Sequence, residues 1–132
     1  MFFIANKKKV LIIDDNPSPQ RLLHIRLKIH HNVKVIKAMD GKNGLIQANV
    51  HNPDLIILEW TLPDIQGIEV LERLRCERKT KNTSILILTG RNKPGNIEDA
   101  FNLGADAYLT KMVSLLISGK KIDEMLNSPS LH

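Results

Sequence analysis

The chain of 132 residues has little cysteine, few aromatic residues and no long hydrophobic run. Its single cysteine, Cys76, excludes an internal disulfide and suits a reducing cytoplasm, which is where we expect the protein to be found. No apolar run approaches the about 20 residues that a membrane helix requires, so neither a membrane span nor a membrane partner is expected. The first residues place apolar side chains before the lysines and lack a small-residue cleavage pattern, so no signal peptide is predicted.

Aromatic residues make up only 4% of the chain, which bears on how its formal net charge of +5 is interpreted. The lysines and arginines are scattered, except over residues 7–9 and 73–81, and no aromatic residues are interleaved with them for base stacking. We therefore interpret the positive charge as a solvated basic face and expect no nucleic-acid partner.

The sequence does contain five short apolar runs rich in Val, Ile and Leu. They occupy residues 8–14, 33–38, 54–59, 84–89 and 106–111. The first, third and fourth are nearly continuous, which is typical of strands covered on both faces. The second alternates with lysines and favours a position at the edge of a sheet.

Segments with the spacing of amphipathic helices separate and follow these runs. They occupy residues 16–30, 41–50, 65–77, 96–105 and 115–126. Asp40 and Ser114 are candidate N-caps. In the fourth segment, Phe101 belongs to the apolar stripe, and Gly104 is the expected stop.

Strands that alternate with helices through short loops imply parallel crossover connections. The pattern predicts an α/β fold with a doubly wound, five-stranded parallel sheet. We expect one domain over residues 7–127, with residues 1–6 and 128–132 as frayed termini.

Polar residues stand at the carboxyl ends of four of the five runs, where functional groups of such sheets collect. They are Asp14, Asp15, Glu59, Thr89 and Lys111. Each alone has an ordinary structural explanation, but acids, a hydroxyl and a lysine at the ends of different strands are not expected by chance. Carboxylate oxygens suit magnesium, and a lysine and a hydroxyl suit phosphoryl oxygens. No Gly-rich loop follows the first run, so nucleotide binding is not expected.

These residues and their surroundings resemble the receiver domains of two-component response regulators. The resemblance runs from Lys8 to Leu126 and includes "LIIDDN", "PDLIILEWTLPDIQG", "ILILTG" and "AFNLGADAYLTK". It implies a CheY-like (βα)5 fold of the flavodoxin type, with strand order 2-1-3-4-5. It also implies a role in phosphorelay signal transduction and not that of an enzyme.

The resemblance assigns roles around a magnesium ion. Asp14 and Asp15 look like the magnesium-binding acids, and the backbone carbonyl of Thr61 like a further ligand. Glu59 stands where the family has its phosphoacceptor aspartate, which makes it a candidate ligand as well as the acceptor position.

Further roles concern switching and partner binding. Thr89 looks like the switch hydroxyl, Lys111 like the lysine that contacts the phosphoryl group, and Tyr108 like the aromatic switch. The resemblance implies that a partner protein docks on helix 4, strand 5 and helix 5, a face that includes residues 92–96 and the pair Lys120 and Lys121. We also expect Trp60, next to the acids, to be partly exposed.

Two residues depart from the family pattern. Glu59 is longer than aspartate by one methylene, and a misplacement of about 1 Å can cost about 100-fold in rate. The same length would let its carboxylate reach Lys111 or Thr89 and imitate a partly activated state. Met112 replaces the proline that usually follows the lysine with a cis bond. Because a cis bond costs a non-proline residue about 2.5–4 kcal/mol, we expect a trans Lys111–Met112 bond or a strained cis one.

Three interpretations follow. The preferred one is an atypical, stand-alone receiver, or pseudo-receiver, which binds a partner protein and whose phosphorylation is weakened or absent. We expect no output domain in this chain, because it ends soon after the fifth helix. The second is an active receiver that accepts a phosphoryl group from a histidine kinase with magnesium. A phosphatase or a flavin protein on a similar sheet is disfavoured, since "DDNPS" provides neither an Asp-x-Asp motif nor a phosphate-binding loop.

Overall fold

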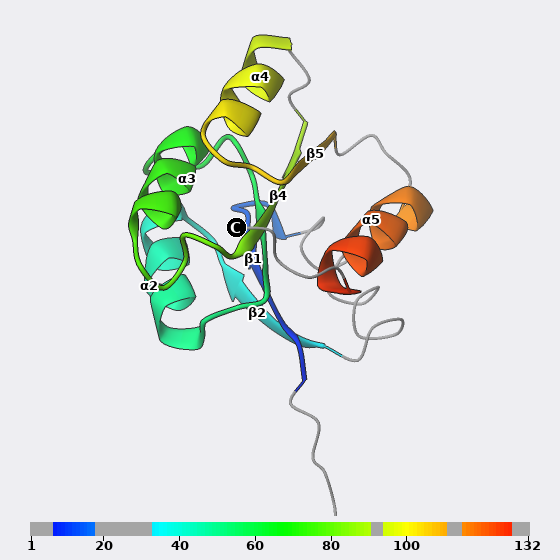
Figure 1. The fold of residues 1–132 in the computed structure, drawn as a ribbon. Coiled ribbons are helices and arrows are strands. Elements are labelled where there is room, and N and C mark those ends of the chain that lie inside the picture. Colours follow the sequence, from blue (N-terminus) through cyan, green and yellow to red (C-terminus); the bar gives the residue numbers. More distant parts are fainter. Residues whose placement is uncertain (1–6, 18–32, 91–93, 111–114, 128–132) are drawn as a thin grey trace, which may run out of the picture.

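The computed structural model describes residues 7–17, 33–90, 94–110 and 115–127, which hold five strands and four helices (Figure 1). The strands are β1 (Lys9–Ile13), β2 (Lys34–Ala38), β3 (Leu55–Leu58), β4 (Ser84–Thr89) and β5 (Ala107–Thr110). The helices are α2 (Gly41–His51), α3 (Gly67–Cys76), α4 (Pro94–Asn102) and α5 (Leu115–Asn127). Most of the helix predicted over residues 16–30, and the predicted cap Ser114, lie outside the described residues. No helix within the described ranges is long and apolar enough to cross a membrane.

The five strands form one parallel sheet in the order β2-β1-β3-β4-β5. The predicted fold class and strand order are therefore confirmed. The alternating second run is β2, which lies at the edge of the sheet as expected.

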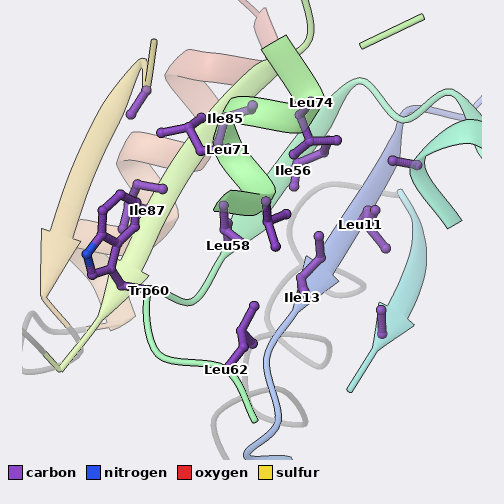
Figure 2. Close-up of a cluster of buried hydrophobic side chains, with 14 of the residues drawn as sticks. Leu11, Ile13, Ile56, Leu58, Trp60, Leu62, Leu71, Leu74, Ile85 and Ile87 are labelled. Carbon is purple, nitrogen blue, oxygen red and sulfur yellow. The ribbon is translucent and has the colours of Figure 1, made fainter. Parts of the chain in front are cut away.

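Helices cover both faces of this sheet (Figure 1). Alternate residues of a strand point to opposite faces. Leu11 and Ile13 of β1 join the cluster under α2, α3 and α4, which Figure 2 shows. Val10 of β1 joins the second cluster, to which α5 contributes Ile122 and Leu126. Because both faces are packed, β3 and residues 10–13 of β1 need apolar residues at every position, which explains their continuous runs.

Local signals fix the ends of two helices. The Asp40 side chain caps α2 and accepts a hydrogen bond from the Asn43 N–H group at 2.7 Å, as predicted. Gly104 follows α4 with a φ of +105°, a conformation that glycine adopts at no steric cost. The expectation for Phe101 was wrong, because its side chain is 47% exposed while that of its neighbour Ala100 is buried. Ala100 and Phe101 are about 100° apart around the helix, and the edge of the buried face falls between them.

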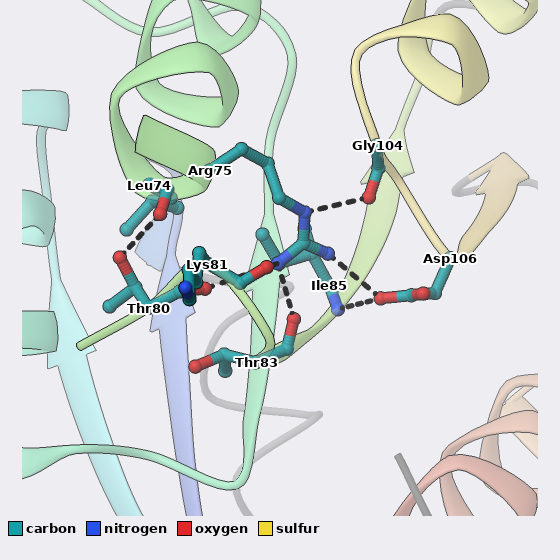
Figure 3. A network of polar contacts seen from close by, with 8 residues as sticks. All are labelled: Leu74, Arg75, Thr80, Lys81, Thr83, Ile85, Gly104 and Asp106. Atoms are coloured by element: carbon teal, nitrogen blue, oxygen red, sulfur yellow. Dashed lines mark hydrogen bonds and ion pairs between the residues drawn. The ribbon is translucent and has the colours of Figure 1, made fainter. Parts of the chain in front are cut away.

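Arg75 connects three segments at the end of the sheet opposite the strands' carboxyl ends (Figure 3). Its Nε donates to the Gly104 carbonyl at 2.9 Å and its Nη1 to the Thr83 carbonyl at 2.7 Å. Its Nη2 lies 3.0 Å from Oδ2 of Asp106, and the same oxygen accepts from the Ile85 N–H group at 2.8 Å. The guanidinium thereby ties the end of α3 to the starts of β4 and β5.

The burial of Arg75 corrects one part of the sequence interpretation. Residues 73–81 were assigned to a solvated basic face, but the Arg75 side chain is only 14% exposed. Burial, the largest influence, lowers the pKa of Arg75, and the charge and hydrogen bond of Asp106 act in the opposite direction. Arg75 is thus a structural residue.

Candidate functional site

The carboxyl ends of the central strands meet at one edge of the sheet because the strands are parallel and in register. Ile13 pairs with Leu58, and Leu58 pairs with Ile87. Asp14 and Glu59 follow directly, and the Glu59 N–H group donates to the Ile13 carbonyl at 2.9 Å. The sequence therefore delivers these two acids to the same edge.

The two acids after β1 have different surroundings. The Asp14 N–H group donates to the Ala38 carbonyl at 3.0 Å, which continues the β1–β2 ladder, and the residue is only 6% exposed. Its Oδ1 accepts from the Asn16 N–H group at 2.9 Å, which fixes the turn after the strand. Asp15 is exposed. The pair thus offers one carboxylate inside the site and one at its rim.

Glu59 is 9% exposed, and its carboxylate turns back toward its own backbone. Oε2 accepts a hydrogen bond from the N–H group of Trp60 at 2.7 Å. The side chain is long enough to bend around to the amide of the next residue. One oxygen of the acid at the end of β3 is therefore held by the start of the loop between β3 and α3.

Trp60 is buried, with 5% exposure, so its predicted partial exposure was wrong. Its indole belongs to the same cluster as Leu58 and Ile87 (Figure 2). The start of α3 lies close behind it, because the Gly67 N–H group donates to the Trp60 carbonyl at 2.8 Å. A Cβ at Gly67 would lie 2.6 Å from the Trp60 Cα, so only glycine permits this approach. The start of α3 therefore lies against the backbone of Trp60, while the indole is buried in the cluster.

The other predicted residues are placed as follows. Thr89 is the last residue of β4, is fully buried and pairs with Thr110 of β5. Tyr108 is half-buried and packs against the cluster that contains Trp60. Thr61 is exposed at the start of the loop after β3. Lys111 and Met112, with the bond between them, lie outside the described residues.

The face proposed for a partner is described only in part. Residues 91–93 lie outside the described residues, and Lys120 is exposed on α5. The role of this face stays a prediction.

In the described part of the chain, no three His, Cys, Asp or Glu side chains are grouped so that they could hold a metal ion. Magnesium does not require such a cage, since it is usually bound through one or two carboxylates and several waters. Asp14 and Glu59, at the ends of adjacent strands, are hard oxygen donors of the kind it takes. The donor chemistry fits magnesium, and the assignment of the ligands stays a prediction.

One residue near the site was missed from the sequence. Asp64, in the loop between β3 and α3, accepts from the N–H groups of Gly41 at 2.8 Å and Lys42 at 2.9 Å, at the start of α2. Partial desolvation of this exposed carboxylate is the largest single influence and would raise its pKa, but hydrogen bonds from backbone N–H groups, led by that of Lys42, together outweigh it and lower the pKa to about 2. The sequence held no signal for this contact, because α2 already has an acidic N-cap in Asp40 and Asp64 is 23 residues away from Gly41 along the chain.

Comparison with known proteins identifies the family. The model of the response regulator receiver domain matches residues 10–117. The chain belongs to this family. The family resemblance inferred from the sequence is thus confirmed, and with it a place in two-component signalling.

Relatives of this receiver domain include two transcriptional regulators. It is 38% identical over 103 residues to the DNA-binding dual master transcriptional regulator RpaA of Synechocystis sp., covering 78% of this chain and 42% of that protein. It is also 38% identical over 107 residues to the alkaline phosphatase synthesis transcriptional regulatory protein PhoP of Bacillus subtilis, covering 81% of this chain and 43% of that one. The chain therefore spans less than half the length of these relatives.

Solved receiver structures agree in fold. The CheY-like receiver domain protein from Methanospirillum hungatei JF-1 is 28% identical and superposes with a TM-score of 0.85 over 92% of this chain and 95% of that one. The chemotaxis response regulator CheY4 of Vibrio cholerae is 27% identical, with a TM-score of 0.84 over 91% of this chain and 99% of that one.

Proposed function

We propose that this receiver domain is an atypical signalling module in which Glu59 occupies the phosphoacceptor position and phosphorylation is weakened or absent. The observation that carries the proposal is the hydrogen bond from the Trp60 N–H group to Oε2 of Glu59 at 2.7 Å. It engages the carboxylate that would have to act as the nucleophile.

The physical reason concerns the geometry of attack. A carboxylate nucleophile must lie in line with the phosphorus atom of the donor and at near-attack distance. Turning the Glu59 oxygen outward would break a charge-assisted hydrogen bond, which contributes about 1.5–3 kcal/mol, or about tenfold to 100-fold in population. This cost adds to that of the longer and more flexible side chain.

Magnesium would be held by Asp14, Asp15, Glu59 and the backbone carbonyl of Thr61. When bound, it would balance negative charge on the carboxylates and on phosphoryl oxygens. Two observations support these roles: the Asn16 N–H group donates to Oδ1 of Asp14 at 2.9 Å, and Asp15 is exposed.

Signalling would proceed through the switch residues and a protein partner. Receiver domains interact with histidine kinases and other proteins. In this chain, the fixed negative charge of Glu59 would stand in for part of the phosphoryl charge, with Thr89 and Lys111 as its partners. Tyr108 would carry the resulting state to the face of α4, β5 and α5, where the partner protein docks.

An active receiver is the second candidate. It is supported by Asp14 and Thr89, which are both buried at the carboxyl edge as an intact site requires. The experiment that separates the two candidates exposes the purified chain to magnesium and a small acyl phosphate, or to a phosphorylated histidine kinase, and measures its intact mass. An unchanged mass supports the atypical module, and a gain of one phosphoryl group on Glu59 supports the active receiver.

A further inference from the structure

The first backbone N–H groups of α2 are bound from two different loops. The side chain of its own N-cap, Asp40, accepts from the Asn43 N–H group at 2.7 Å. Asp64 binds the two N–H groups before it, with Oδ1 on Gly41 at 2.8 Å and Oδ2 on Lys42 at 2.9 Å. These donors have no partner within the helix, and the positive end of the helix dipole favours a carboxylate there. The loop between β3 and α3 therefore supplies a cap to a helix that is distant in sequence.

Apolar packing reinforces the same junction. A Cβ at Gly41 would run into the side chain of Ile65 and lie 2.9 Å from Cγ2 of Val70. Ile65 follows Asp64 directly, and Val70 belongs to α3. The close approach at Gly41 thus lets the loop lie against the start of α2, where the Asp64 carboxylate reaches both N–H groups.

The loop that Asp64 anchors is the one that leaves Glu59. A hydrogen bond from the Gly67 N–H group to the Trp60 carbonyl, at 2.8 Å, joins the end of this loop to its start. Thr61 lies between Trp60 and Asp64, three residues before the latter. The position of the Thr61 backbone is therefore bounded on one side by the strand and on the other by the anchored carboxylate.

We propose that Asp64 is a positioning residue that holds the loop after Glu59 against α2 and thereby sets the place of the Thr61 carbonyl. The magnesium part of this inference rests on the proposed function, in which that carbonyl is a metal ligand. The part that concerns the loop does not. Asp64 acts through the backbone of the loop, by its bonds to the N–H groups of Gly41 and Lys42.

Asp54 provides a matched control. It is also exposed, and its Oδ2 accepts from the Lys9 N–H group at 2.7 Å, which likewise joins two separate elements. It precedes β3 and so lies at the opposite end of the sheet from Glu59. Removing its carboxylate breaks the same kind of bond without touching the loop.

The test compares the wild type with Asp64→Ala, Asp64→Asn and Asp54→Ala by amide hydrogen exchange and by magnesium titration, both followed by NMR. In Asp64→Ala we expect exchange of the Gly41, Lys42 and Gly67 amides to accelerate about tenfold. The dissociation constant for magnesium, followed through the Thr61 amide signal, should rise several-fold. Asp64→Asn keeps one acceptor oxygen, so its exchange rates and magnesium affinity should lie between those of the wild type and Asp64→Ala. Asp54→Ala should match the wild type at all these amides. If Asp64→Ala does not fold, Asp64→Asn decides.

Two results would overturn the inference. One is faster exchange at Gly41 and Lys42 with unchanged exchange at Gly67, because Asp64 would then only cap α2. The other is equal magnesium affinity in the wild type and Asp64→Ala. If the wild type itself binds no magnesium, the proposed metal site fails, while exchange at Gly67 still decides whether Asp64 holds the loop.

Discussion

The Glu59 carboxylate accepts a hydrogen bond from the Trp60 N–H group at 2.7 Å, so the acid at the end of β3 is bound to the loop that follows it. Trp60 in turn is buried in the cluster under α2, α3 and α4. Freeing this oxygen therefore requires the Glu59 side chain to rotate away from an amide that stays in place, because Trp60 is packed in the core. The position of the Glu59 carboxylate therefore depends on how tightly the strands and helices around Trp60 pack.

The Arg75 network should contribute strongly to stability. Arg75→Lys keeps the charge but cannot present the planar set of donors that binds Gly104, Thr83 and Asp106. We expect it to lower the free energy of unfolding by about 2–4 kcal/mol, because partly buried carbonyl and carboxylate groups lose their partners. Urea unfolding of the two proteins measures this.

Arg73→Lys is the control for that substitution. Arg73 pairs with Glu69 at 3.3 Å in an exposed i, i+4 arrangement, for which changes under about 0.5 kcal/mol are expected. If Arg75→Lys were as mild as Arg73→Lys, the network in Figure 3 would not hold the segments together.

Gly67 should tolerate no side chain. A Cβ there would lie 2.6 Å from the Glu59 carbonyl oxygen and the Trp60 Cα, so Gly67→Ala forces the loop or α3 to move. We expect a loss of about 1–3 kcal/mol by thermal unfolding, as for other overpacked sites. Gly90→Ala, with nothing within 4 Å of its Cβ, should leave stability nearly unchanged. Equal losses in the two variants would mean that the contact behind Trp60 is not tight.

Asp64 should make the free energy of unfolding depend on pH in the acid range. Its pKa is lowered from the ordinary 3.8 to about 2 in the folded protein, so its contribution is complete above the ordinary value and is lost as the pH falls through the folded one. The stability advantage of the wild type over Asp64→Asn should therefore shrink from about pH 5 to about pH 2. Urea midpoints measured across this range test it, and a constant difference would contradict it.

The proposed partner face gives a prediction about binding. Tyr108→Ala combined with Lys120→Glu should weaken capture of the partner protein, because one change removes a half-buried ring and the other reverses an exposed charge. Lys34→Glu on the edge strand β2 reverses an exposed charge elsewhere and serves as the control. Calorimetric titration with the partner protein gives the affinities of the wild type, the double variant and Lys34→Glu. Equal affinities for these three proteins would exclude this face as the docking site.

The sheet was predictable because its signal is local. Each central strand is a continuous apolar run, and a strand covered on both faces admits little else. Because these apolar runs end at Asp14 and Glu59, both acids could be assigned to strand ends. Parallel strands then bring those ends to one edge of the sheet. The cap at Asp40 also needed only its own neighbourhood.

The misplaced and missed residues depend on contacts between distant segments. Trp60 is buried in a cluster to which several strands and helices contribute, and nothing within the strand signals this. Arg75 sits in a basic stretch, but the carbonyls and the carboxylate it binds come mainly from two other segments. Asp64 is an exposed loop acid, and its bonds to Gly41 and Lys42 become apparent only when α2 is placed beside it.

The most direct test of the account is phosphorylation of Glu59→Asp beside the wild type. With magnesium and a small acyl phosphate, the wild type should keep its unmodified intact mass. Glu59→Asp should gain one phosphoryl group that hydroxylamine removes, because the shorter side chain restores the reach of an aspartate. Should Met112 displace Lys111 and leave the single variant inactive, Glu59→Asp with Met112→Pro is the matched restoration. A wild-type protein that is itself phosphorylated on Glu59 would contradict the account.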